Sequence, residues 1–201
     1  MDNKQREIRN YVGGKINTLK NLNESNARAA LAKLRRGVGK HPGNVPDIWE
    51  FTLGNLPEVF LSKSSEPTPG EWAVHMSLTL FALHQQGKDP KQSPMSDSTP
   101  ESSISLGGAV QALVHRKGEV SKDAIKRRFD TVVTSNSPEE LSHHLRGIIQ
   151  LLRDESIKLD YPRLAEDLFS FQSTATRDGV RLRWGQDYYE IKRKDEEIDE
   201  E

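Results

Sequence analysis

The sequence predicts an all-α protein, a two-lobed helical bundle. Three observations indicate this fold class: helix-capping patterns recur along the chain, apolar residues repeat every three or four positions, and period-two alternation is nearly absent. The chain has 201 residues and no cysteine, which excludes disulfides and cysteine-based zinc sites. Its hydrophobic content of 34% is low, so we expect a modest core and segments that stay solvated.

The first two helices are expected at about 3–21 and 25–38. The second has an apolar stripe at helical spacing, which should face the core. Its members are Ala27, Leu31, Leu34 and Val38.

Two tetrads, T-P-G-E at 68–71 and S-P-E-E at 137–140, match the capping box with proline at the first helical position. Each opens an apolar stripe whose members lie three or four residues apart. The first stripe holds Trp72, Met76, Leu80 and Leu83, and the second holds Leu141, Leu145, Ile148 and Leu152. Both tetrads therefore predict the start of a helix with one apolar face.

Further helices are expected at about 105–116, 121–134 and 160–172. Asp160 is the expected N-cap of the last of these, and Pro162 falls in its first turn.

The stretch V-R-L-R-W at 180–184 alternates as a short strand would, after a turn signal. Continued further, the segment gives a helix with Leu182, Tyr188 and Tyr189 on one apolar side. We therefore predict a helix here.

A polar stretch divides the chain. Residues 87–101 contain three prolines, three serines and one sizeable apolar residue, too little to order the segment by burial. We predict an N-terminal helical lobe (1–86), a flexible linker (87–102), a C-terminal helical lobe (103–190) and an acidic disordered tail (191–201).

Basic residues gather near the start of the chain. Residues 1–48 hold ten lysines and arginines against four acids, while residues 195–201 hold six acids, so the net charge of −1 hides a local excess. A local cationic field attracts polyanions whatever the total charge.

Three groups of cations are candidates for binding nucleic acid. The first lies on the second expected helix and just after it, where only Glu24 opposes it, and consists of Arg28, Lys33, Arg35, Arg36 and Lys40. The second consists of Lys126, Arg127, Arg146 and Arg153, and the third of Arg177, Arg181 and Arg183. For each group the alternative is a solvated helix face, and in the last two groups acids are near enough in the sequence to pair with the cations.

Nucleic acid fits these cations better than a membrane does. A membrane-surface helix needs bulky apolar residues opposite its cations, whereas the second helix offers mainly alanines and two leucines. Aromatic residues are only 6% of the chain and fall on or beside apolar stripes, so we expect contacts to phosphates without base readout. No apolar run approaches the roughly 18 residues that span a bilayer, and we expect a cytoplasmic protein.

No residue pattern supports catalysis. None of the six histidines has a partner spaced for metal binding, and no nucleophile–base pair is evident. The run G-V-G-K-H-P-G at 37–43 lacks the P-loop spacing and its trailing Ser or Thr. We therefore expect no enzymatic activity, no metal and no cofactor.

Four segments carry a family resemblance by their combination, order and spacing. They are I-S-L-G-G-A-V (104–110), L-R-G-I-I-Q-L-L-R (145–153), D-Y-P-R-L-A-E-D-L (160–168) and R-W-G-Q-D-Y-Y (183–189). Together they resemble the CasB family, the small subunit of the type I-E CRISPR Cascade complex.

The resemblance implies a non-catalytic, two-lobed helical subunit of an antiviral guide-RNA ribonucleoprotein. It implies two copies packed head to tail, contacts with the backbone subunits, and a basic surface that helps to hold target DNA and the displaced strand. It also implies functional roles for Arg35, Arg36 and Arg146, and for Arg177 and Arg181.

Two other functions stay open from the sequence. The chain would be a purely structural adaptor if its cations met acidic patches of partner subunits and no nucleic acid. A nuclease would need a metal-dependent centre, which no residue cluster in the sequence supports.

Overall fold

The computed structural model describes residues 3–100 and 102–190, and the expected acidic tail lies outside the described residues. The helices are α1 (Asn3–Asn21), α2 (Glu24–Arg35), α3 (Trp49–Thr52), α4 (Pro69–His84), α5 (Leu106–Lys117), α6 (Glu119–Thr134), α7 (Pro138–Asp154), α8 (Tyr161–Phe171) and α9 (Thr174–Tyr189). Within the described ranges there is no strand, only a single parallel bridge between Ser96 and Leu159. The all-α prediction is confirmed, as is the helix predicted over 180–184.

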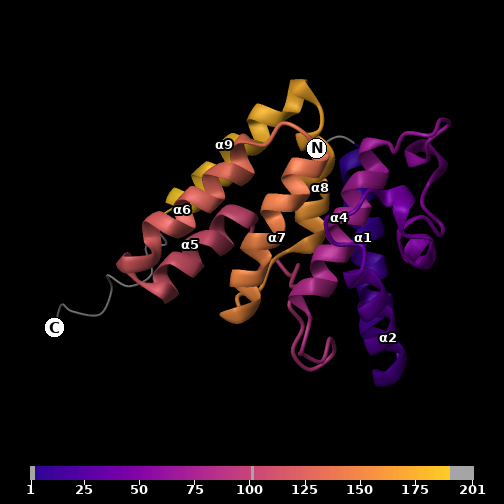
Figure 1. The fold of residues 1–201 in the computed structure, drawn as a ribbon, viewed down its shortest axis with the longest axis horizontal. Helices are drawn as coiled ribbons and strands as arrows, with labels where there is room; N and C mark the ends of the chain where they lie inside the picture. Colours follow the sequence, from indigo (N-terminus) through magenta and orange to yellow (C-terminus); the bar gives the residue numbers. More distant parts are fainter. Residues whose placement is uncertain (1–2, 101, 191–201) are drawn as a thin grey trace.

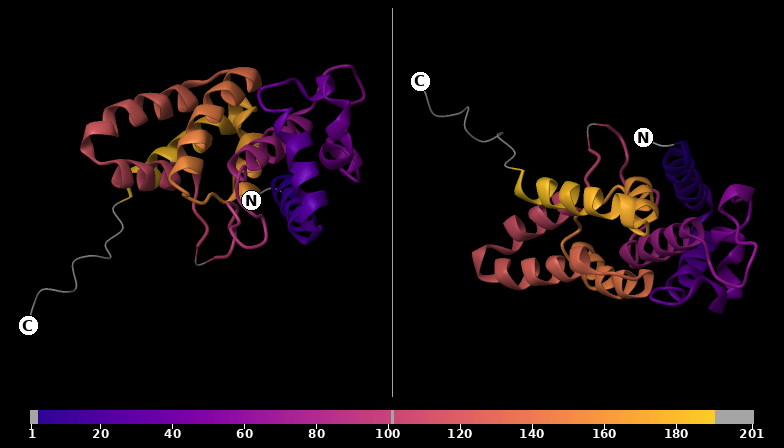
Figure 2. Two further views of the ribbon diagram at one scale, coloured as in Figure 1. Left: turned by 60° about the horizontal axis from the view of Figure 1, so that its bottom comes forward. Right: turned by 90° about the horizontal axis from the view of Figure 1, so that it is seen from above.

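Helix α4 is the centre of the bundle. Figure 1 shows it between α1 and α2 on one side and α7 and α8 on the other, with α5, α6 and α9 at the far end of the molecule, and Figure 2 shows the same order from two other directions. Every residue from Gly70 to His84 is buried. The predicted apolar stripe of α4 is buried, and the rest of this range is buried as well because neighbouring helices pack around it.

The two predicted capping boxes form differently. At α4, the Thr68 side chain accepts a hydrogen bond from the Glu71 N–H at 3.1 Å, and the Glu71 carboxylate accepts one from the Thr68 N–H at 2.7 Å. At α7, Ser137 accepts from the Glu140 N–H, but the Glu140 carboxylate accepts from the N–H of Asn136 instead. The reciprocal half of the second box is thus displaced by one residue.

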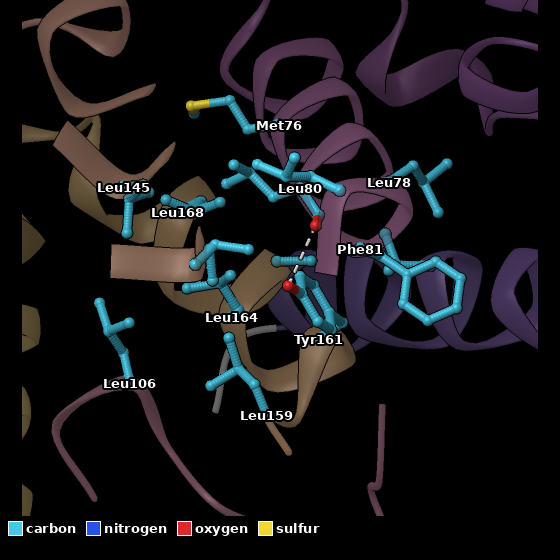
Figure 3. Close-up of a cluster of buried hydrophobic side chains, with 14 of the residues drawn as sticks. Met76, Leu78, Leu80, Phe81, Leu106, Leu145, Leu159, Tyr161, Leu164 and Leu168 are labelled. Carbon is cyan, nitrogen blue, oxygen red and sulfur yellow. Dashed lines mark hydrogen bonds between the residues drawn. The ribbon is translucent and has the colours of Figure 1, made fainter. Parts of the chain in front are cut away.

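The core joins the two halves of the chain. Side chains of α4, α5, α7 and α8 converge in one cluster, in which the Tyr161 hydroxyl donates to the Leu80 carbonyl oxygen at 3.2 Å (Figure 3). The same hydroxyl lies 3.1 Å from His84 Nδ1.

Helix α1 makes its most extensive contact with α8, from the opposite end of the sequence. Arg9 forms ion pairs with Asp160 at 3.0 Å and with Glu166 at 3.4 Å. Asp160 is fully buried and also accepts hydrogen bonds from the Ser103 hydroxyl at 2.7 Å and the Arg163 N–H at 2.8 Å. This confirms Asp160 as the N-cap of α8 and shows that its charge links three segments.

The segment between the predicted lobes is anchored on both of them. Met95 is only 4% exposed, and its N–H donates to the Gln85 side chain at 2.9 Å. Leu159 donates to the Met95 carbonyl oxygen at 3.1 Å, and the Lys20 ammonium donates to the Ser96 carbonyl oxygen at 3.1 Å. The division into separate lobes stays a prediction, although the one sizeable apolar residue of the segment is buried.

Helix α9 buries a different face from the one expected. Val180, Trp184 and Tyr188 are buried, whereas Leu182 and Tyr189 are 62% and 67% exposed. The expected apolar side is wrong for Leu182 and Tyr189, because the buried stripe follows a four-residue interval toward α5 and α8.

Helices α5 and α9 cross closely at Gly107. A Cβ atom added there would lie 2.0 Å from the Trp184 carbonyl oxygen. A glycine is therefore required for this crossing.

Candidate nucleic-acid interface

Helix α2 holds the first group of predicted cations. Its N-cap, Asn23, accepts a hydrogen bond from the Asn26 N–H at 2.9 Å. The helix buries one face against α4 and α1 and leaves its cations toward solvent. The buried residues are Ala27, Ala30, Leu31 and Leu34, while Val38 is half-buried.

The exposed cations of this group are weakly neutralised. Arg28 pairs with Glu24, and Arg36 lies 3.3 Å from Asp47, but all four side chains are at least 59% exposed, where an ion pair contributes little. Lys33 and Lys40 are exposed and have no partner among residues 3–100 and 102–190. Most of their charge therefore faces solvent.

Arg35 is set apart from its neighbours because it is half-buried. It lines a groove of about 510 Å³ between α2 and the end of α4, together with Arg28 and Lys88. Burial lowers the pKa of the Arg35 guanidinium from its ordinary value. The groove therefore has cations on both walls, together with the carboxylates of Glu24 and Asp89.

Lys88 connects the groove to α7. Its ammonium donates to the carbonyl oxygen of Arg153 at 2.7 Å, and the Arg153 guanidinium donates to Gln86 Oε1 at 3.2 Å. Burial, with the nearby Arg153 charge, lowers the pKa of Lys88. The structure thus brings Arg28, Arg35 and Arg153 into one region, and it adds Lys88, which the sequence reasoning missed.

The remaining members of the second group are divided. Arg146 is exposed on α7, seven residues before Arg153, and has no partner in the described part of the chain. On α6, Lys126 pairs with Asp130 at 2.8 Å, and Arg127 donates to the Asp123 carbonyl oxygen at 3.2 Å. Lys126 fits the alternative of local pairing, while Arg146 is available to a ligand.

The three arginines of the third group contact other residues of the protein. Arg177 donates to the Phe171 carbonyl oxygen at 2.8 Å, and Arg181 donates to the Val133 carbonyl oxygen at 2.7 Å. Both guanidiniums lie within 5.6 Å of the Phe171 ring centre. Arg183 forms an ion pair with the buried Asp167 at 3.0 Å.

These contacts fix α9 to the end of α6 and to α8. No contact in the described residues brings any of the three arginines to the groove beside α2. They are in position to stabilise the fold, and a binding role for them stays a prediction.

The described residues hold no group of three or more His, Cys, Asp or Glu side chains that could bind a metal ion. His75 is buried with Nε2 3.0 Å from the Gly37 carbonyl oxygen, and burial lowers its pKa. Burial also lowers the pKa of His84 to about 4. Among the helices described, none is long and apolar enough to cross a membrane.

Comparison with known proteins identifies the family. The sequence model of the CRISPR-associated protein Cse2 family matches residues 30–189. A comparison with curated proteins gives no match.

Solved structures share the fold. CasB from Thermobifida fusca is 27% identical, with 92% of this chain and 98% of that chain covered and a TM-score of 0.72. A chain from a CRISPR RNA-guided surveillance complex is 22% identical, with coverages of 90% and 92% and a TM-score of 0.68. CasB from M. ruber is 20% identical, with coverages of 89% and 92% and a TM-score of 0.62. Since the family match extends over most of the chain, the protein belongs to the CRISPR-associated protein Cse2 family, which confirms the resemblance to CasB in its sequence.

Proposed function

We propose that this protein is a non-catalytic subunit of a CRISPR RNA-guided surveillance complex and that it holds nucleic acid on a basic surface. This surface, the α2–α7 track, consists of Lys33, Arg35, Arg36 and Lys40 beside α2, then Lys88, then Arg153 and Arg146 on α7. The family match and the likeness to a chain of such a complex support the subunit role.

One observation carries the binding role. Lys33, Arg35, Lys40, Lys88 and Arg146 form no ion pair within the described residues. Cations that only stabilise a fold are usually matched by nearby acids, as Arg183 and Lys126 are here. The five cations named above pair with no such acids, and Lys88 lies between those of α2 and those of α7. Such an arrangement favours binding of a long polyanion.

The proposed mechanism requires no bond to break. Exchange between a DNA duplex and an RNA–DNA heteroduplex is nearly balanced in energy, so a strand displaced by the guide RNA re-anneals readily. A cationic surface that holds the sugar–phosphate chain shifts this exchange toward the open state. Contacts of this kind ignore base sequence.

The partners follow from the same proposal. They are guide RNA and target DNA, the backbone subunits of the complex, and a second copy of the chain. The protein acts in the cytoplasm, without cofactor or metal.

The test is the salt dependence of binding to random single-stranded DNA, measured by fluorescence anisotropy. If four to six phosphates are neutralised, log affinity should fall with log salt at a slope of roughly −3 to −4. Replacing the exposed cations of α2 and the turn after it, Lys33→Ala with Arg36→Ala and Lys40→Ala, should weaken binding alike across sequences and flatten the slope by about 2.

A matched control removes lysines that have their own acids. Lys122 and Lys126 pair with Glu119 and Asp130, so Lys122→Ala with Lys126→Ala should leave the slope nearly unchanged. An affinity that does not depend on salt, or equal losses in both variants, would favour a structural adaptor that meets only protein partners.

A further inference from the structure

Arg35 is an exception among the arginines. Six arginines of the described residues are half-buried, and five of them donate hydrogen bonds to protein oxygens. These five are Arg9, Arg153, Arg163, Arg177 and Arg181. Arg35 alone has no partner in the described part of the chain.

This arrangement costs free energy in the unbound protein. A guanidinium carries five N–H donors and keeps its charge at any physiological pH. Removing it partly from water without a partner is unfavourable, which the lowered pKa of Arg35 reflects. An anion in the groove would offset that cost.

The acids of the groove do not supply that anion. Glu24 pairs with Arg28, and Asp89 Oδ1 accepts the N–H groups of Lys91 and Gln92 at 2.8 Å each. Lys88, on the opposite wall from α2, has a hydrogen bond to a carbonyl oxygen but no carboxylate partner. Asp154 acts on the Lys88 charge from a distance but is paired with Arg153. Two cations on facing walls of the groove are therefore left without a direct ion pair.

We propose that this groove is a discrete site for one phosphodiester group of a nucleic-acid strand, held by the Arg35 guanidinium from α2 and the Lys88 ammonium from the segment after α4. The planar guanidinium matches two phosphate oxygens, and a flexible ammonium adds a point charge. This inference rests on the proposed function, because the strand supplies the phosphate.

The surroundings favour a strand over an isolated acidic side chain. Arg28 lies on the same wall of the groove as Arg35, and Lys88 contacts the Arg153 carbonyl oxygen at the end of α7, so further cations lie on both sides of the site. A polyanion with evenly spaced charges can use all of them, whereas a single carboxylate cannot. The uncharged lining residues are Leu31, Ala32, Gln85, Gly87 and Pro90, so no aromatic side chain is present in the lining to stack a base.

The site also links the two parts of the fold. Because Lys88 already donates to the end of α7, a phosphate beside it would lie between α2 and α7. A strand bound in this groove would therefore lie beside the end of α7.

The first experiment follows the side-chain Nε–H resonances of the arginines in the full-length protein at low salt. The probes are the dinucleotide TpT, its uncharged methylphosphonate analogue, inorganic phosphate and a hexaglutamate peptide. We expect TpT to shift the Arg35 resonance and the methylphosphonate analogue to leave it in place.

A second measurement uses a matched pair of substitutions. Arg35→Lys keeps the charge but loses the two-pronged donor, so TpT binding should weaken about tenfold. Arg36→Lys makes the same change on the exposed neighbour and should alter binding less than twofold. A thermal melt by circular dichroism verifies that both variants fold.

Three outcomes would overturn the site. The first is an equal shift of the Arg35 resonance with the charged and the uncharged dinucleotide. The second is a shift with inorganic phosphate but none with TpT. The third is a larger shift with hexaglutamate than with TpT, which would indicate an acidic protein partner. Each of these leaves the proposed function standing if longer DNA still binds with a salt slope that depends on Lys33 and Lys40. Loss of all DNA binding would instead remove the proposed function.

Discussion

Replacing Gly107 by alanine should destabilise the protein by forcing α5 and α9 apart. The added Cβ would lie 2.0 Å from the Trp184 carbonyl oxygen, 2.9 Å from its carbonyl carbon and 3.0 Å from the Tyr188 nitrogen. All three are backbone atoms, so no side chain can rotate away, and α9 must move by roughly 1 Å or more to restore an ordinary contact.

The magnitude follows from two opposing effects. Overpacking a core contact typically costs about 1–3 kcal/mol, and a backbone clash belongs at the upper end. Alanine gains up to about 1 kcal/mol over glycine in helix propensity. We expect a net loss of about 2 kcal/mol in the free energy of unfolding, which for a chain of this size lowers Tm by about 4–8 °C.

The adjacent glycine supplies the control. A Cβ on Gly108 would lie 3.5 Å from Ile104 Cγ2 and from Ser105 Oγ, which is ordinary contact. Gly108→Ala should therefore keep or raise Tm, by up to about 4 °C. Urea titration and calorimetry measure both variants, and a Gly107→Ala protein as stable as Gly108→Ala would refute the close crossing.

Other substitutions test the charges described above. Arg35→Met should raise the free energy of unfolding of the free protein by up to about 1 kcal/mol in urea titrations, since it removes an unpaired, partly desolvated cation; a clear loss would show that Arg35 has a structural partner. Burial lowers the pKa of His84 to about 4 and that of His75 as well, so the unfolded chain takes up protons that the folded one does not, and stability should fall as pH drops from about 6.5 to 4. His84→Gln should reduce the slope of the unfolding free energy against pH by at most about 1.4 kcal/mol per pH unit. An unchanged slope would show that the pKa of His84 is not lowered by folding. Asp160→Asn should cost about 2 kcal/mol because it leaves the charge of Arg9 only partly matched, and a double-mutant cycle with Arg9→Gln that showed strict additivity would argue against the pairing.

Local signals predicted most of the helices. The expected span of 3–21 agrees with α1, and Asp160 and Thr68 cap α8 and α4 as their sequences indicate. The expected end of the second helix at residue 38 is three residues too late, because the chain turns after Arg35. The short helix α3 and the 3₁₀ turns around it were missed, since elements of three or four residues are too short to show a period.

Long-range contacts limited the prediction of the candidate site. A run of cations on α2 is visible in the sequence, but whether a cation is free depends on residues far along the chain. Arg181 binds the carbonyl oxygens of Val133 and Ser135, about fifty residues away, and backbone acceptors leave no mark in a sequence. Lys88 was not predicted as a site residue because the cation beside it, Arg153, is 65 residues away in the sequence.

The pairing of α1 with α8 has a consequence for biosynthesis. During translation at roughly 5–20 residues per second, α1 would emerge on the order of ten seconds before α8 is made. Throughout that interval Ile8, Val12 and Ile16, which are buried in the finished protein, lack the helix that covers them. A nascent chain stalled before residue 161 should therefore recruit chaperones that recognise apolar helices, and release of the full chain should free them.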